Sequence, residues 1–216
     1  MDVVIANLDL YLQGFGVTLL LLGVSGLGAL VLGTIIAAMR ISPIATLRGI
    51  ATVYTEIVRN TPLTLVVLFA VVIVPLLGAR VPFIISGFAA LAVYTSPFVA
   101  EALRSGINGV PIGQAEAARS LGLGFSQSVA LVIFPQAFRM TIPPLINVFI
   151  ALAKNTSVVG GVGFVAELFA SGRTLANAHG NAVIPILIGV AFFYLVVTVP
   201  LGLLATQLER KWVVQR

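Results

Sequence analysis

The sequence predicts an all-α membrane protein with five transmembrane helices, and its composition is the first reason. Only 9% of the 216 residues are charged, as 12 Lys and Arg and 7 Asp and Glu, whereas a soluble domain has about 25%. Hydrophobic residues make up 59% and the mean hydropathy is +1.13, more than a soluble fold can bury. This composition excludes a soluble enzyme and a disordered chain, and the absence of Cys excludes a disulfide scaffold.

The second reason is the spacing of the charges, because a helix needs about 20 mainly apolar residues to cross the hydrocarbon core. The charge-free run 120–138 is long enough for a span, but it contains Gly122, Gly124, several polar side chains and Pro135, and we do not count it as one. The other apolar runs predict five spans, at about 12–38, 60–79, 82–101, 141–160 and 183–206.

The third reason is the distribution of basic residues, which gather on the cytoplasmic side of membrane proteins. With five spans and the N-terminus outside, nine basic residues lie inside and two outside, Lys154 being left out because it lies within a span. A sixth span at 120–138 would reduce this bias to six against five. The net charge of +5 is therefore explained by inner loops, not by nucleic acid. The inner residues are Arg40, Arg48, Arg59, Arg104, Arg119, Arg139, Arg210, Lys211 and Arg216; the outer ones are Arg80 and Arg173.

The N-terminus fits this orientation, because no basic residue precedes Arg40. A cleavable signal peptide needs a basic start and a short apolar core. We therefore expect the first span to be an uncleaved anchor, in one transmembrane domain over 10–210 whose C-terminus lies inside.

The inner loop between the third and fourth spans, 102–139, is the longest polar stretch. Pro111 can open a short helix over 113–121, which is rich in Ala and ends at Gly122. A second helix over 125–134 is expected to break at Pro135. The flat Ala face suits a groove on a cytosolic partner, and a solvated connector helix is the alternative. Glu116 and Arg119 are three apart and can pair on its rim.

This loop resembles the signature of permease subunits of ABC importers. The signature reads Glu-Ala-Ala, three residues, Gly, nine residues, then an apolar Ile-x-Leu-Pro segment. Here it is Glu116-Ala117-Ala118, then Gly122, then Val132-Ile133-Phe134-Pro135, with apolar replacements at two of the last four positions.

Further motifs are similar to those of the permeases for polar amino acids, over roughly residues 10–210. These motifs look closest to the glutamate permeases of actinobacteria. They are the run from Tyr54 to Leu63, Glu101 with Arg104 and Gly106-Ile107, Gly113-Gln114, Pro135-Gln136-Ala137, and Lys154-Asn155-Thr156-Ser157.

The resemblance implies the type I ABC importer permease fold and a set of partners. These are ATPase subunits on the cytoplasmic side, an extracytoplasmic solute-binding protein, and a second permease in a homodimer or heterodimer. No Walker A motif is present, since neither Lys154 nor Lys211 follows Gly. The chain is thus not expected to be an enzyme or to hold a metal or cofactor, and ATP and Mg would bind the partner. The ATPase-coupling role falls on Gly113, Gln114, Glu116, Ala117, Ala118, Gly122 and Pro135.

Lys154 is the best lead to the substrate, because a Lys near mid-membrane costs roughly 2.5–3.5 kcal/mol and such residues usually face a polar interior. With no carboxylate inside the third and fourth spans to neutralise it, it suits the carboxylate of an amino acid. Snorkelling to the membrane interface is the alternative. Other candidates for substrate or gate contact are Asn147, Asn155, Thr156, Tyr94 and Thr95, although the last two can instead bond across helices.

Two further polar positions have simpler interpretations. Glu56 and Arg59 are predicted to form a structural ion pair, and His179 stands alone, which argues against a metal site. The sequence thus predicts a multi-pass permease of the bacterial plasma membrane for polar amino acids, with glutamate as the expected substrate. The rivals are a secondary transporter or channel, which usually has an intramembrane carboxylate or His, and a membrane enzyme, which needs clustered catalytic groups.

Overall fold

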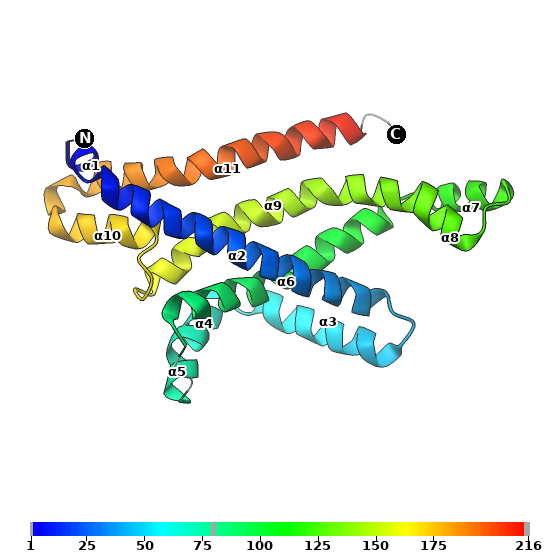
Figure 1. Ribbon diagram of the computed structural model, residues 1–216, viewed down its shortest axis with the longest axis horizontal. Helices are drawn as coiled ribbons and strands as arrows, with labels where there is room; N and C mark the ends of the chain where they lie inside the picture. The colour runs from blue at the N-terminus through cyan, green and yellow to red at the C-terminus, as the bar shows by residue number, and fades with distance from the viewer. Residues whose placement is uncertain (1, 79–80, 214–216) are drawn as a thin grey trace.

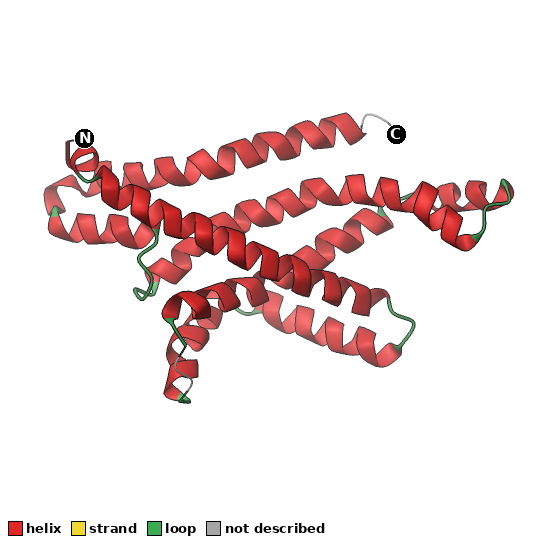
Figure 2. Ribbon diagram, in the orientation of Figure 1, coloured by secondary structure: helices red, strands yellow, loops and turns green. Residues whose placement is uncertain are grey.

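The computed structural model describes residues 2–78 and 81–213, and every regular element in these ranges is a helix (Figures 1 and 2). Arg80 and Arg216, which entered the count of basic residues, lie outside the described residues. The four long helices are α2 (Leu8–Ile41), α6 (Phe83–Asn108), α9 (Phe134–Gly161) and α11 (Val183–Val213).

Four helical stretches are long and apolar enough to cross a membrane, and a bent pair brings the number to five. The pair consists of α3 (Ala45–Asn60) and the stretch Leu63–Leu76, which meet at 102°. That stretch contains α4 (Leu63–Leu68), the π-turn η1 (Phe69–Ile73) and α5 (Val74–Leu76). The bend follows from Pro62, which disfavours helical backbone in the residue before it; Thr61 is extended, with φ −94° and ψ 131°. The expected single helix over 60–79 is thus wrong in its boundaries.

The fourth membrane helix begins well before the expected residue 141. It starts at α8 (Phe125–Ser128) and continues through the π-turn η2 (Val129–Ile133) into α9, as one stretch to Gly161. The prediction that Pro135 breaks this helix is wrong. A proline clashes with the carbonyl four residues earlier in an α-helix, but here the turn before it is widened, with Phe134 N bonded to Val129 O. The run 120–138 accordingly forms no span of its own among the described residues.

Small residues let the long helices pack closely. A Cβ on Gly33 of α2 would lie 2.6 Å from the side chain of Val99 on α6, and one on Gly106 of α6 would meet Thr141 of α9. Such close approach is the usual basis of helix association in lipid. The result is a layer in which α2 packs on α6, α6 on α9 and α9 on α11.

The short helices lie at the two ends of this layer. At one end are α1 (Asp2–Ala6), α10 (Leu168–Ala178) and the 3₁₀ turn η3 (Gly180–Ala182). At the opposite end, α7 (Ile112–Ser120) and α8 project beyond the long helices (Figure 1). The segment α4 to α5 projects from the side of the layer (Figure 1).

Candidate functional site

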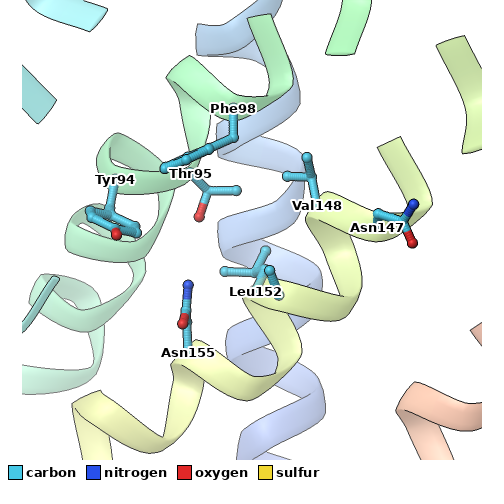
Figure 3. A pocket seen from close by; sticks show the side chains of 8 residues that line it. Tyr94, Thr95, Phe98, Asn147, Val148, Leu152 and Asn155 are labelled. Atoms are coloured by element: carbon cyan, nitrogen blue, oxygen red, sulfur yellow. The ribbon is translucent and has the colours of Figure 1, made fainter. Parts of the chain in front are cut away.

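A cleft of about 390 Å³ lies between α6 and α9, and it collects four of the six residues predicted to contact substrate (Figure 3). Helical periodicity explains why these residues lie together, because residues four apart share one face of a helix. Tyr94 and Phe98 are four apart on α6, as Ala151 is from both Asn147 and Asn155 on α9. The lining residues are Tyr94, Thr95, Phe98, Asn147, Val148, Ala151, Leu152 and Asn155.

The cleft offers polar groups within an apolar wall. Thr95 is buried, and its hydroxyl has no hydrogen-bond partner within the described part of the chain. The Tyr94 and Phe98 rings lie 5.5 Å apart between centroids. Asn155 from α9 points toward Tyr94 and Thr95 from α6 (Figure 3). Few polar groups in a largely apolar wall are typical of small-molecule sites, and a buried hydroxyl without a partner, such as that of Thr95, is uncommon.

Lys154 and Thr156 lie apart from this cleft. Successive helix residues point about 100° apart, and Lys154 faces a separate hollow of about 360 Å³ between α9 and α11. Ser157 and Tyr194 line that hollow with it. Thr156 is fully buried and donates to Ala153 O at 2.8 Å, so solute cannot reach it in this conformation. Of the six predicted residues, four therefore line the cleft, Lys154 lines the hollow, and Thr156 lines neither.

Glu167 has a structural role that its place in the sequence did not suggest. It is fully buried and caps α10, where its carboxylate accepts from the Phe169 and Ala170 N–H groups at 2.9 Å each. It also accepts from Tyr194 of α11 at 2.8 Å and Thr18 of α2 at 3.4 Å. The carboxylate thus ties α10 to two membrane helices.

A charged cluster formed by Arg40, Arg59 and Glu101 joins α2, α3 and α6. Arg59 bonds Glu101, and Arg40 Nη1 lies 3.8 Å from the same carboxylate oxygen. The predicted ion pair between Glu56 and Arg59 is therefore wrong: Arg59 turns to α6, while Glu56 accepts from the neighbouring Asn60 at 3.4 Å. Tertiary packing supplies a closer carboxylate than the helix's own surface does.

The predicted coupling residues lie on α7 and its flanks, as the sequence placed them. Gly113, Gln114, Glu116 and Ala117 are exposed, and only Ala118 is buried within α7. The helix ends at Gly122, whose φ of +81° favours glycine. Pro135 lies on the exposed surface of α9. Glu116 and Arg119 form no ion pair within 4.0 Å in the described structure.

Large apolar side chains are exposed around α7. The side chains of Ile112, Leu121 and Phe125 are 78%, 82% and 85% exposed. Large exposed apolar side chains next to polar residues are typical of a surface that binds a partner.

The architecture is that of a multi-pass membrane protein, and comparison with known proteins gives the family. Residues 29–214 match the family of binding-protein-dependent transport system inner membrane components, and the chain belongs to that family. The predicted all-α permease fold is confirmed by a solved amino acid ABC transporter, determined with histidines, whose chain superposes with a TM-score of 0.87 at 31% identity over 96% of both chains. The predicted orientation in the membrane stays a prediction.

Similar proteins narrow the class further. The glutamate transport system permease GluC of Corynebacterium efficiens is 44% identical, with 95% of each chain covered. The probable glutamine ABC transporter permease GlnM of Bacillus subtilis is 40% identical, over 95% of this chain and 94% of that one. The chain is thus a multi-pass amino-acid ABC permease of the bacterial inner membrane. The inward-facing methionine transporter MetNI, at 19% identity and a TM-score of 0.72, shares the fold.

Proposed function

We propose that the chain is the permease subunit of an ATP-driven importer for polar amino acids, with glutamate as the main substrate. The observation that carries this proposal is the exposed surface of α7 with Ile112, Leu121 and Phe125 around it. α7 and α8 lie at one end of the molecule (Figure 1), in the loop that the distribution of basic residues predicts to be cytoplasmic.

An ATPase on the cytoplasmic side is the partner whose chemistry fits this surface. An Ala-rich helix loses little side-chain entropy when it docks, and Ile112, Leu121 and Phe125 add apolar contact area. The chain has no Walker A sequence, so ATP and Mg would bind the ATPase. ATP-driven closure of that partner moves α7 and switches the membrane helices between outward- and inward-open states. A solute-binding protein delivers substrate outside, and a second permease, identical or similar, completes the path.

The cleft between α6 and α9 is the proposed substrate site. Thr95 and Asn155 hydrogen-bond the amino acid, Tyr94 and Asn147 border it, and the apolar wall excludes water. Lys154, in its separate hollow, acts as a gate contact between α9 and α11. The similarity to permeases named for glutamate and glutamine supports this size and polarity of substrate.

Uptake by the reconstituted complex tests the proposal. The chain, its second permease if distinct, the ATPase and the receptor are placed in proteoliposomes, and labelled glutamate, glutamine, aspartate and lysine are offered with and without internal ATP. We expect glutamate uptake that requires ATP and receptor and that Glu116→Lys abolishes. Uptake driven by a proton or sodium gradient without ATP would instead establish a secondary transporter, and passive equilibration a channel.

A further inference from the structure

The Arg40, Arg59 and Glu101 cluster contains more positive than negative charge. Two guanidinium groups share one carboxylate, which leaves one net positive charge in the cluster. The Arg40 side chain is only 14% exposed, and its Nη1 atom is buried without a hydrogen-bond partner among the described residues. A buried donor left unpaired is costly and uncommon. The cluster therefore has one donor and one positive charge without an anionic acceptor among the described residues.

Neighbouring charges do not supply that acceptor. Glu56, the carboxylate of α3, makes no ion pair within 4.0 Å in the described part of the chain. Arg104, one turn further along α6, adds a positive charge to the same helix. The surroundings thus favour an anion that comes from outside the chain.

The cluster adjoins the substrate cleft through Phe98. The Phe98 ring lines the cleft, and the Arg59 guanidinium carbon lies 5.6 Å from its centroid, over the ring. From Tyr94 to Glu101 is seven residues of α6, about 10 Å along the helix. Tyr54 fixes α3 to α6 beside this point, because its hydroxyl bonds Ser96 at 2.9 Å and Val93 O at 3.1 Å. Phe98 therefore lies between the cleft and the cluster.

We propose that this cluster is a charge-reading site, at which the side-chain carboxylate of an acidic amino acid binds Arg40 and Arg59 in competition with Glu101. The inference rests on the proposed function and deepens it, because it assigns the preference for an acidic over a neutral amide side chain to residues outside the cleft's own lining. Arginine suits the task, since its planar donors bind carboxylates in pairs. Glu101 holds the arginines in place when no substrate is bound.

Opposite changes of charge test this site. The assembled permease–ATPase complex is placed in nanodiscs without receptor, and the Kd values of labelled glutamate and glutamine are measured. Arg40→Gln reduces the net charge of the cluster to zero, and we expect about tenfold weaker glutamate binding with glutamine binding unchanged. Arg40→Lys keeps the charge and restores most of the glutamate affinity. Glu101→Gln removes the competitor and strengthens glutamate binding alone.

The matched control is Arg48→Gln, because Arg48 is exposed and bonds only the Ser42 and Pro43 carbonyls, at 2.8 Å each. It should change neither Kd. Equal effects of Arg40→Gln on both ligands, or none on either, would overturn the inference. If Arg40→Gln fails to assemble, Glu101→Gln decides: a tighter glutamate Kd supports the site, and an unchanged or weaker one refutes it.

Different results would contradict the charge-reading site and the proposed function. A wild-type complex that takes up glutamate with ATP but binds neither amino acid in nanodiscs contradicts the charge-reading site and leaves the proposed function standing. A wild-type complex with no ATP-driven amino acid uptake contradicts the proposed function, and the site with it.

Discussion

Removal of the Glu167 side chain should destabilise the permease strongly, although no sequence motif marks this residue. Glu167→Ala removes the cap of α10, which is worth about 0.5–2 kcal/mol. It also leaves the Tyr194 hydroxyl without its acceptor at 2.8 Å, which costs about 1–3 kcal/mol in a buried setting. Together these losses come to about 3 kcal/mol.

A second substitution tests the geometry more finely. Each carboxylate oxygen accepts one backbone N–H, from Phe169 or Ala170. Glu167→Gln has nearly the same shape but offers one oxygen, so its amide nitrogen must face a donor. We expect Glu167→Gln to lose about half as much stability as Glu167→Ala.

Thermal unfolding of the purified permease in detergent measures both effects. For a chain of this size, 1 kcal/mol corresponds to about 2–4 °C in Tm, so Glu167→Ala should lower Tm by about 6–12 °C. Glu209→Ala is the control, because Glu209 is exposed near the end of α11. A Glu167→Ala protein with the Tm of the Glu209→Ala protein would refute the assignment of Glu167 as the residue that joins α10 to the membrane helices.

Three further outcomes are expected. Lys154→Met should abolish substrate-stimulated uptake while the variant still co-purifies with the ATPase. Uptake at the wild-type rate would contradict the role of Lys154 as a gate contact. Thr95→Val removes the unpaired hydroxyl and should raise the KM for uptake about tenfold with Tm unchanged, whereas an unaltered KM would place the substrate elsewhere. Gly33→Ala should cost about 1–3 kcal/mol in unfolding free energy, because its Cβ would lie 2.6 Å from Val99 and 2.8 Å from Ser96 O. Gly16→Ala, which meets nothing within 4 Å, should leave Tm unchanged or higher.

Local signals predicted the inner loop better than the spans. Pro111 and Gly122 bound α7 in the structure as in the sequence, because a helix start and a left-handed helix end depend on neighbouring residues alone. Pro62 is a similar local signal for the bend between α3 and α4. The bend was not predicted, because the charge-free run 60–79 was interpreted as one span. Pro135 misled, since its clash is relieved by a π-turn that composition does not show.

The site was predicted in part, for geometric reasons. Asn147 and Asn155 share a cleft with α6 because their spacing places them on one face, whereas Lys154 is adjacent in sequence to Asn155 but points elsewhere. The contacts of Glu167 depend on Thr18, 149 residues away, and Tyr194, 27 residues away. Spacing and periodicity along the sequence cannot predict contacts between side chains that come together only in the folded chain.

The proposed function depends on the coupling of α7 to a partner ATPase, and receptor-stimulated ATP hydrolysis by the complete reconstituted complex measures that coupling. Gly122→Asp places a side chain at a φ of +81° beside α7, and Gly49→Asp makes the same change on exposed α3, where nothing lies within 4 Å. We predict that Gly122→Asp abolishes the stimulation by loaded receptor and that Gly49→Asp preserves it. Full stimulation in the Gly122→Asp complex would contradict the account.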